Sequence, residues 1–115
     1  MIAVIFEVEP HAAHTEDYLA EAARLKPRLE QMDGFISVER FQSLTTPGKI
    51  LSLSIWRDEE SVRAWRDDDA HRLTQHRGRE EIFRDYRLRV ASVVRDYGMQ
   101  QRAQAPADSR AAHGA

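Results

Sequence analysis

The sequence contains no cysteine among its 115 residues. Disulfide bonds, thiol nucleophiles, zinc–cysteine sites and iron–sulfur clusters are therefore excluded. A chain without cysteine suits a reducing compartment, and we expect a cytoplasmic protein. No stretch approaches the ~20 apolar residues that a membrane-spanning helix needs. The first ten residues also lack the basic start of a signal peptide, so we expect no membrane partner.

Excess positive charge is also missing. Seventeen basic and nineteen acidic residues give a formal net charge of -2, which argues against a nucleic-acid partner. The chain has no P-loop, no GxGxxG fingerprint and no nucleophile elbow, so nucleotide cofactors and serine-hydrolase chemistry are not expected. A mass of 13.3 kDa allows one domain.

Hydrophobic periodicity predicts the order of the elements. Residues 2–9, 35–44, 49–56 and 86–97 alternate apolar and polar side chains, which is typical of strands. Residues 15–32 show helical spacing, and a second helical region starts at 58 and resumes near 69–77. The resulting β-α-β-β-α-β order predicts an α+β, ferredoxin-like fold with an antiparallel sheet.

Residues that typically begin, bend or end helices refine this prediction. Thr15 is the expected N-cap of the first helix, and Pro27 predicts a kink or an early stop in it. Asp58 is the expected N-cap of the second helical region. Residues 1–98 form the predicted domain. Residues 99–115 have no periodicity and no Phe, Trp or Tyr, and we expect them to be a mobile tail.

One face of the predicted sheet is covered by helices and the other needs a partner. The second face carries apolar side chains that are too numerous for comfortable contact with water. They are predicted to be Ala3, Ile5, Phe35, Phe41, Trp56, Ala91 and Val93. Glu7, Glu39, Arg89 and Arg95 lie among them. We therefore expect a homodimer in which two sheets stack.

Several segments resemble the antibiotic biosynthesis monooxygenase family. They are the step Asp33-Gly34-Phe35, the run SIWRDEESVRAW at 54–65 and the stretch that ends at Gly98. The resemblance covers residues 1–98 and implies a dimeric α/β barrel. It also implies a cofactor-free oxygenase that acts on phenols, or a protein that binds or degrades haem.

For the haem branch, the resemblance implies a tryptophan, a histidine and a strand-one asparagine. Trp65 matches the tryptophan and His76 approximates the histidine. The asparagine has no counterpart, because this part of the chain offers Ile5, Phe6 and Glu7. No cofactor is expected for the leading hypothesis, and haem is the alternative.

The leading hypothesis is a monooxygenase-like protein that binds a flat aromatic molecule, of the phenol or quinol type, between helix and sheet. Trp65 would stack on it, and His76 would act as a base or hydrogen-bond donor. Phe83 and Tyr86 would line the pocket, with Arg79 or Tyr86 positioning polar groups and Trp56 on the opposite wall. His71 and Glu7 are the remaining candidate site residues. For Glu7, an ion pair with Arg89 or Arg95 is the favoured interpretation.

No metal site is expected. His71 and His76 would point about 140° apart on a regular helix, and the acidic run at 67–69 lacks the spacing of a calcium loop. A third hypothesis is a non-catalytic, dimeric ligand-binding module. It predicts a pocket that Trp65 and Phe83 fill with their own side chains.

Overall fold

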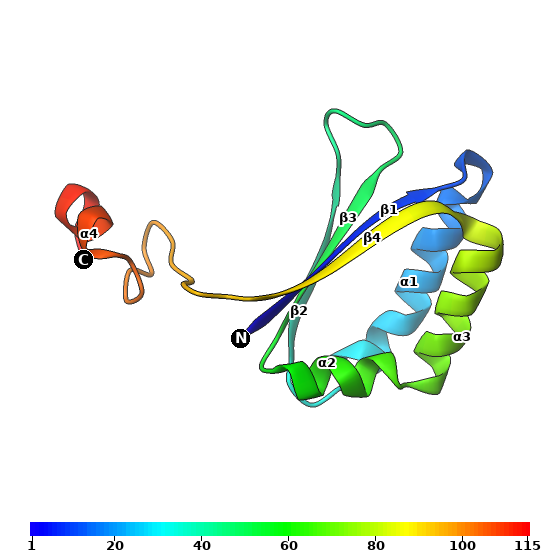
Figure 1. Cartoon of the computed structure of the whole chain (residues 1–115), viewed down its shortest axis with the longest axis horizontal. Coiled ribbons are helices and arrows are strands. Elements are labelled where there is room, and N and C mark those ends of the chain that lie inside the picture. Colours follow the sequence, from blue (N-terminus) through cyan, green and yellow to red (C-terminus); the bar gives the residue numbers. More distant parts are fainter.

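The chain folds as a four-stranded antiparallel sheet with helices on one face, which confirms the predicted ferredoxin-like α+β fold (Figure 1). The computed structural model describes the backbone of residues 1–115 and every side chain except those of Asp69 and Ala70. The strands are β1 (Ile2–Pro10), β2 (Phe35–Gln42), β3 (Ile50–Trp56) and β4 (Phe83–Ser92). The helices are η1 (Ala12–His14), α1 (Thr15–Glu30), α2 (Glu59–Arg66), α3 (Asp69–Arg77), the π-helix η2 (Gly78–Ile82) and α4 (Ala107–His113).

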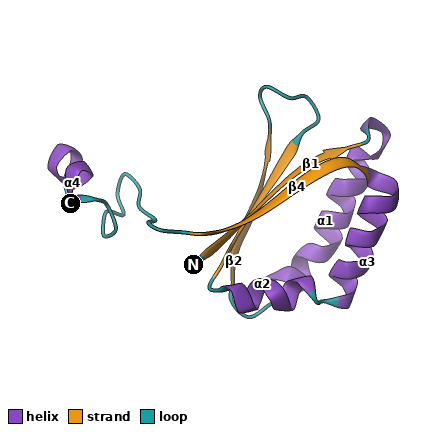
Figure 2. Ribbon diagram, in the orientation of Figure 1, coloured by secondary structure: helices purple, strands orange, loops and turns teal.

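The strand order β2-β3-β1-β4 places β1 in the middle of the sheet, between β3 and β4. Helices α1, α2 and α3 all lie against the same face, as Figure 2 shows. Alternation along β1 sends Ile2, Val4, Phe6 and Val8 toward these helices. The opposite β3 residues in register are Trp56, Ser54, Ser52 and Ile50.

This register corrects part of the predicted second face. Trp56 is only 1% exposed and packs with Ile2 and Leu29 under the helices, and Phe35 packs against the same cluster. Both aromatic side chains therefore belong to the helix-covered face. The second face instead carries Leu51, Leu53 and Ile55 of β3, which alternate with those residues and pair with β1.

The core consists of two clusters at opposite ends of the sheet. Val8, Tyr18, Ile50 and Ile82 form one, and Ile2, Leu29 and Trp56 form the other. Between them the inner face of β3 has only Ser52 and Ser54. Serine side chains are too small to reach the helices, so the middle of the interface stays hollow.

Glu7 lies on the second face of the sheet. It forms ion pairs with Arg89 of β4 at 3.6 Å and with Lys49 at 3.4 Å. The predicted pairing with Arg89 is therefore present, and Lys49 takes the place proposed for Arg95.

Several element ends differ from the prediction. Helix α1 begins at Thr15 itself, preceded by His14 with no side-chain cap, and it continues past Pro27 to Glu30. The predicted Thr15 cap and the early stop at Pro27 are wrong. Strand β4 begins at Phe83 and ends at Ser92, three residues earlier at its start than predicted. Asp58 caps α2 as predicted, accepting from the Ser61 N–H at 2.8 Å.

The segment after β4 leads away from the body of the molecule and contains α4 (Figure 1). Arg102 and Arg110 donate to backbone carbonyls within this segment, including those of Ser109 and Ala105. The short helix was not predicted, and the mobility of residues 99–115 stays a prediction.

Candidate functional site

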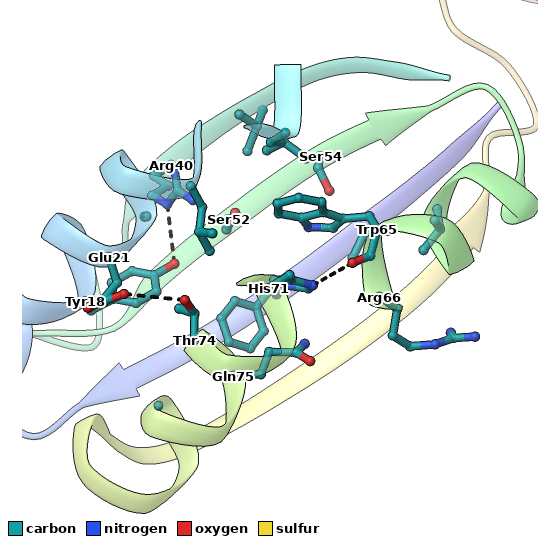
Figure 3. Close-up of a pocket in the computed structure, with 18 of the residues that line it drawn as sticks. Tyr18, Glu21, Arg40, Ser52, Ser54, Trp65, Arg66, His71, Thr74 and Gln75 are labelled. Carbon is teal, nitrogen blue, oxygen red and sulfur yellow. Dashed lines mark hydrogen bonds between the residues drawn. The ribbon is translucent and has the colours of Figure 1, made fainter. Parts of the chain in front are cut away.

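A cavity of about 170 Å³ occupies the hollow between the two core clusters. Most of its wall is apolar, with side chains from β1, α1, β2 and α2 such as Val4, Leu25, Val38 and Val62. Figure 3 shows its polar side chains gathered from α1, the sheet and α3. An apolar cleft with a few polar groups has the usual character of a small-molecule site.

His71 provides the imidazole of the cavity. It lies in the first turn of α3, where Asp68 accepts from its backbone N–H at 3.2 Å. Its ring stacks on Trp65 with the ring centroids 4.5 Å apart and the planes 17° from parallel. Its Nδ1 lies 3.1 Å from the Trp65 carbonyl oxygen. A carbonyl oxygen can only accept, so Nδ1 carries the hydrogen and Nε2 keeps its lone pair.

Burial lowers the pKa of His71 below its ordinary value of 6.5, because the interior disfavours the charged ring. The Trp65 carbonyl and nearby Asp68 oppose this effect without cancelling it. At neutral pH the ring is therefore neutral, with a fixed tautomer and an unprotonated Nε2. This is the state that a general base needs.

A second polar group lies at the α1–β2 side of the cavity. Arg40 of β2 donates from Nε to the hydroxyl of Tyr18 on α1 at 3.4 Å (Figure 3). Ser52 is the β3 residue opposite Arg40 and lines the same cavity. The Tyr18 ring itself is 7% exposed and belongs to the core.

Glu21 also lines the cavity, but its charge is already compensated. It forms ion pairs with Arg24 at 2.7 Å and with Arg77 at 2.6 Å, and Thr74 donates to it at 3.4 Å. The hydrogen bond and charge of Arg24, supported by Arg77 and Thr74, lower the pKa of Glu21 despite partial burial. Glu21 is thus an ionised structural carboxylate that ties α1 to α3.

The structure brings together only part of the predicted site. Trp65, Phe83, Trp56 and His71 line the cavity. His76 is exposed on α3 and does not line it, so His71 supplies the imidazole that the sequence analysis assigned to His76.

The other predicted site residues lie elsewhere. Tyr86 packs its ring 5.7 Å from Phe6, and the Arg79 guanidinium lies 6.0 Å from the Tyr86 ring, both outside the cavity lining. Glu7 lies on the opposite face of the sheet, in its ion pairs. None of these three reaches the cavity.

Four further residues of the cavity lining were not predicted from the sequence: Tyr18, Glu21, Arg40 and Ser52. One signal was available: within β2 the charged Arg40 shares a face with Val38, which should pack on the helices. A cation on an apolar strand face indicates either an ion pair or a ligand.

No group of three or more His, Cys, Asp or Glu side chains converges as a metal site within the described part of the chain. Among those residues, no helix is both long and apolar enough to cross a membrane.

The family model for antibiotic biosynthesis monooxygenases matches residues 1–77. The chain belongs to the antibiotic biosynthesis monooxygenase family. A curated relative from Pyricularia oryzae, named jasmonate monooxygenase ABM, is 47% identical over 94 residues, which are 82% of this chain and 44% of that protein. This chain thus spans less than half the length of that relative.

Solved structures share the fold at lower identity. A protein from Mycobacterium tuberculosis superposes with a TM-score of 0.75 at 15% identity, covering 84% of this chain and 98% of its own. A protein from Shewanella oneidensis gives a TM-score of 0.72 at 19% identity, covering 78% and 87%. These structural similarities show that the chain shares its fold with both proteins.

Proposed function

We propose that this family member is a cofactor-independent monooxygenase that oxidises a small, flat phenol in the cavity, with His71 as the base. The observation that carries the proposal is the neutral His71, whose Nδ1–H is held by the Trp65 carbonyl 3.1 Å away. Its Nε2 can take a proton from a phenol that enters beside it.

The reaction balances without an added reductant. Proton transfer to Nε2 gives a phenolate, which is electron-rich enough to pass an electron to O2 directly. The two radicals combine, one oxygen atom stays on the ring and the other leaves as water, so that phenol + O2 gives quinone + H2O. The substrate supplies all four electrons, and the apolar walls keep bulk water from the reactive intermediate.

The geometry of the cavity bears on two alternatives, a pocket filled by its own side chains and a haem site. Trp65 and Phe83 line the cavity without filling it, which favours a ligand site over a closed core. His76 lies outside the cavity, so it does not fit the role of an axial haem ligand there.

The curated relative's name supports a second candidate. Because that protein is named a jasmonate monooxygenase, the substrate here could instead be a small acid with few or no aromatic atoms. Hydroxylation of such a C–H bond requires two electrons from an external reductant, unlike quinone formation. Arg40 in the cavity wall favours this candidate, because a guanidinium suits a carboxylate.

We also propose that the protein is a cytoplasmic homodimer. The support for the dimer is the apolar outer face of the sheet, which no helix of the chain covers (Figure 2). The support for the compartment is the absence of cysteine.

Oxygen uptake with a panel of naphthols and hydroquinones tests the proposal. We expect one O2 consumed for each quinone formed, with no added cofactor and with one labelled oxygen atom from ¹⁸O2 in the product. Jasmonate with and without NADH tests the second candidate in the same cell. No uptake above the protein-free rate with any phenol would rule out the leading proposal.

A further inference from the structure

We propose that Arg40, Tyr18 and Ser52 form an anion subsite that holds a carboxylate of the ligand, so that the cavity prefers apolar acids to their neutral analogues. This inference deepens the proposed function, because it names a substrate class for the same cavity. It rests on an arginine in the cavity wall with which no described carboxylate forms an ion pair.

Arg40 is the first of these donors. Among the side chains that the structure describes, no carboxylate lies within ion-pair distance of its guanidinium. Its Nε donates to the Tyr18 hydroxyl over a long 3.4 Å, and its Cζ lies 5.9 Å from the centre of the Tyr18 ring. Yet Arg40 is only partly exposed and lines a largely apolar cavity. Partly buried cations are costly unless they are paired, so a missing anionic partner is the simplest explanation.

Tyr18 and Ser52 extend the same cluster. The Tyr18 oxygen accepts from Arg40, so the hydroxyl hydrogen is available to donate to a ligand. Ser52 lies opposite Arg40 in the strand register. Figure 3 shows Arg40, Tyr18 and Ser52 on one side of the cavity, away from the contact between His71 and Trp65. A ligand can therefore place its acid at Arg40 and its reactive part near His71.

The surrounding charges favour an anion as well. The nearby carboxylate is Glu21, and Arg24 and Arg77 already pair with it. Arg77 also pairs with Glu81, so Arg24 and Arg77 are balanced by two carboxylates. The charge left without a described carboxylate partner is that of Arg40, which attracts an anion and repels a cation.

Binding under anaerobic conditions tests the subsite independently of turnover. The probes are 1-naphthoate and methyl 1-naphthoate, which share the ring system and differ in charge, titrated by tryptophan fluorescence and calorimetry. Charge-assisted hydrogen bonds predict that the acid binds about ten- to a hundred-fold more tightly than the ester. Arg40→Met should abolish this preference and leave ester affinity within about two-fold.

Further variants locate the anion. Tyr18→Phe, which removes only the hydroxyl, should reduce the preference several-fold. Arg66→Met removes the other arginine of the cavity lining, which is exposed and lies toward Trp65, and the preference should survive. Arg40→Lys keeps the charge without the planar fork and should give an intermediate preference. Thermal melts of each variant confirm folding.

The outcomes separate the two proposals. Equal affinity for acid and ester, no binding of either probe, or a preference lost in Arg66→Met but kept in Arg40→Met would each overturn the subsite. An Arg40-dependent preference without any phenol oxidation would support the subsite while the proposed reaction fails. Oxidation of phenols without an acid preference would do the reverse.

Discussion

At the scale of single residues, His71 shows how neighbours decide the chemistry of a side chain. The Trp65 carbonyl fixes the tautomer, the Trp65 ring fixes the plane, and burial keeps the ring uncharged. His76 is on the same helix but has an exposed side chain and none of these contacts. The proposed role of a base therefore falls to His71 and not to His76.

The lowered pKa of His71 predicts the acid limb of the pH–rate profile. Protonation removes the lone pair, so activity should decline only as pH falls below 6.5 toward the lower folded-state pKa. Proton NMR should show the His71 imidazole titrating below the ordinary value, and its signal should vanish in His71→Gln. An acid limb centred above pH 6.5 would contradict the assignment.

The lowered pKa of His71 also predicts how the stability of the folded protein changes with pH. In the unfolded chain His71 binds its proton near pH 6.5, whereas the folded protein resists protonation to lower pH. The unfolded state therefore holds more protons between the two pKa values, and stability decreases as pH falls through that window. His71→Gln should flatten this part of the stability curve.

At the scale of elements, the connection from α1 to β2 depends on close contact with α2. Gly34 has φ +85°, and a Cβ placed there would lie 1.9 Å from the Oγ of Ser61, a residue that is 4% exposed. Arg57 also donates to the Gly34 carbonyl at 2.8 Å. Glycine is required here both for the backbone conformation and for the close approach of α2.

A pair of substitutions separates these two requirements. Gly48 has φ +80° but open space around it. Gly48→Ala should therefore lower the free energy of unfolding only by the strain of the left-handed conformation, about 1–2 kcal/mol. Gly34→Ala should cost at least about 1 kcal/mol more, because Ser61 must move as well. Urea unfolding of both variants measures the difference, and equal losses would show that the contact with Ser61 relaxes freely.

The elements were predictable from sequence because alternation and helical spacing depend on local side-chain order. The sheet faces were harder to assign. Trp56 was predicted to lie on the face that stacks on a partner, whereas it shares the inner face with Ser52 and Ser54, which leave room for the cavity. Arg40 was missed as well, because a charged side chain is not expected on the helix-covered face of a strand unless a cavity lies beside it.

The site was only half predictable. Trp65 was found because it matches the family's tryptophan, and Phe83 because it precedes the predicted fourth strand, but the choice between His71 and His76 depends on how α3 turns after α2. That turn is set by the local Asp68 cap of α3 and by the stacking of His71 on Trp65, which is a contact between α3 and α2. Helical spacing alone does not contain them.

At the scale of the whole molecule, one sheet face is left without a covering layer. Ile5 and Leu53 pair across β1 and β3 at the centre of this face, with Glu39 of β2 on the other side of Leu53. We predict that two copies join through it. Sedimentation should give twice the 13.3 kDa chain mass at micromolar concentration.

A matched pair of variants tests this assembly. Leu53→Glu places a charge on the face beside Glu39 and should yield monomers. Leu73→Glu changes an exposed leucine of α3 and should leave the dimer intact. A wild-type monomer, or dissociation by both variants alike, would refute assembly through this face.

We propose that His71 is the base of an oxygenase cavity. The initial rate of O2 consumption with a naphthol substrate, measured for wild type, His71→Gln and His76→Gln at pH 7.5, tests this role. We expect a loss of about 10²–10⁴-fold for His71→Gln and a rate within about two-fold of wild type for His76→Gln. Equal rates for the two variants, or a greater loss for His76→Gln, would contradict it.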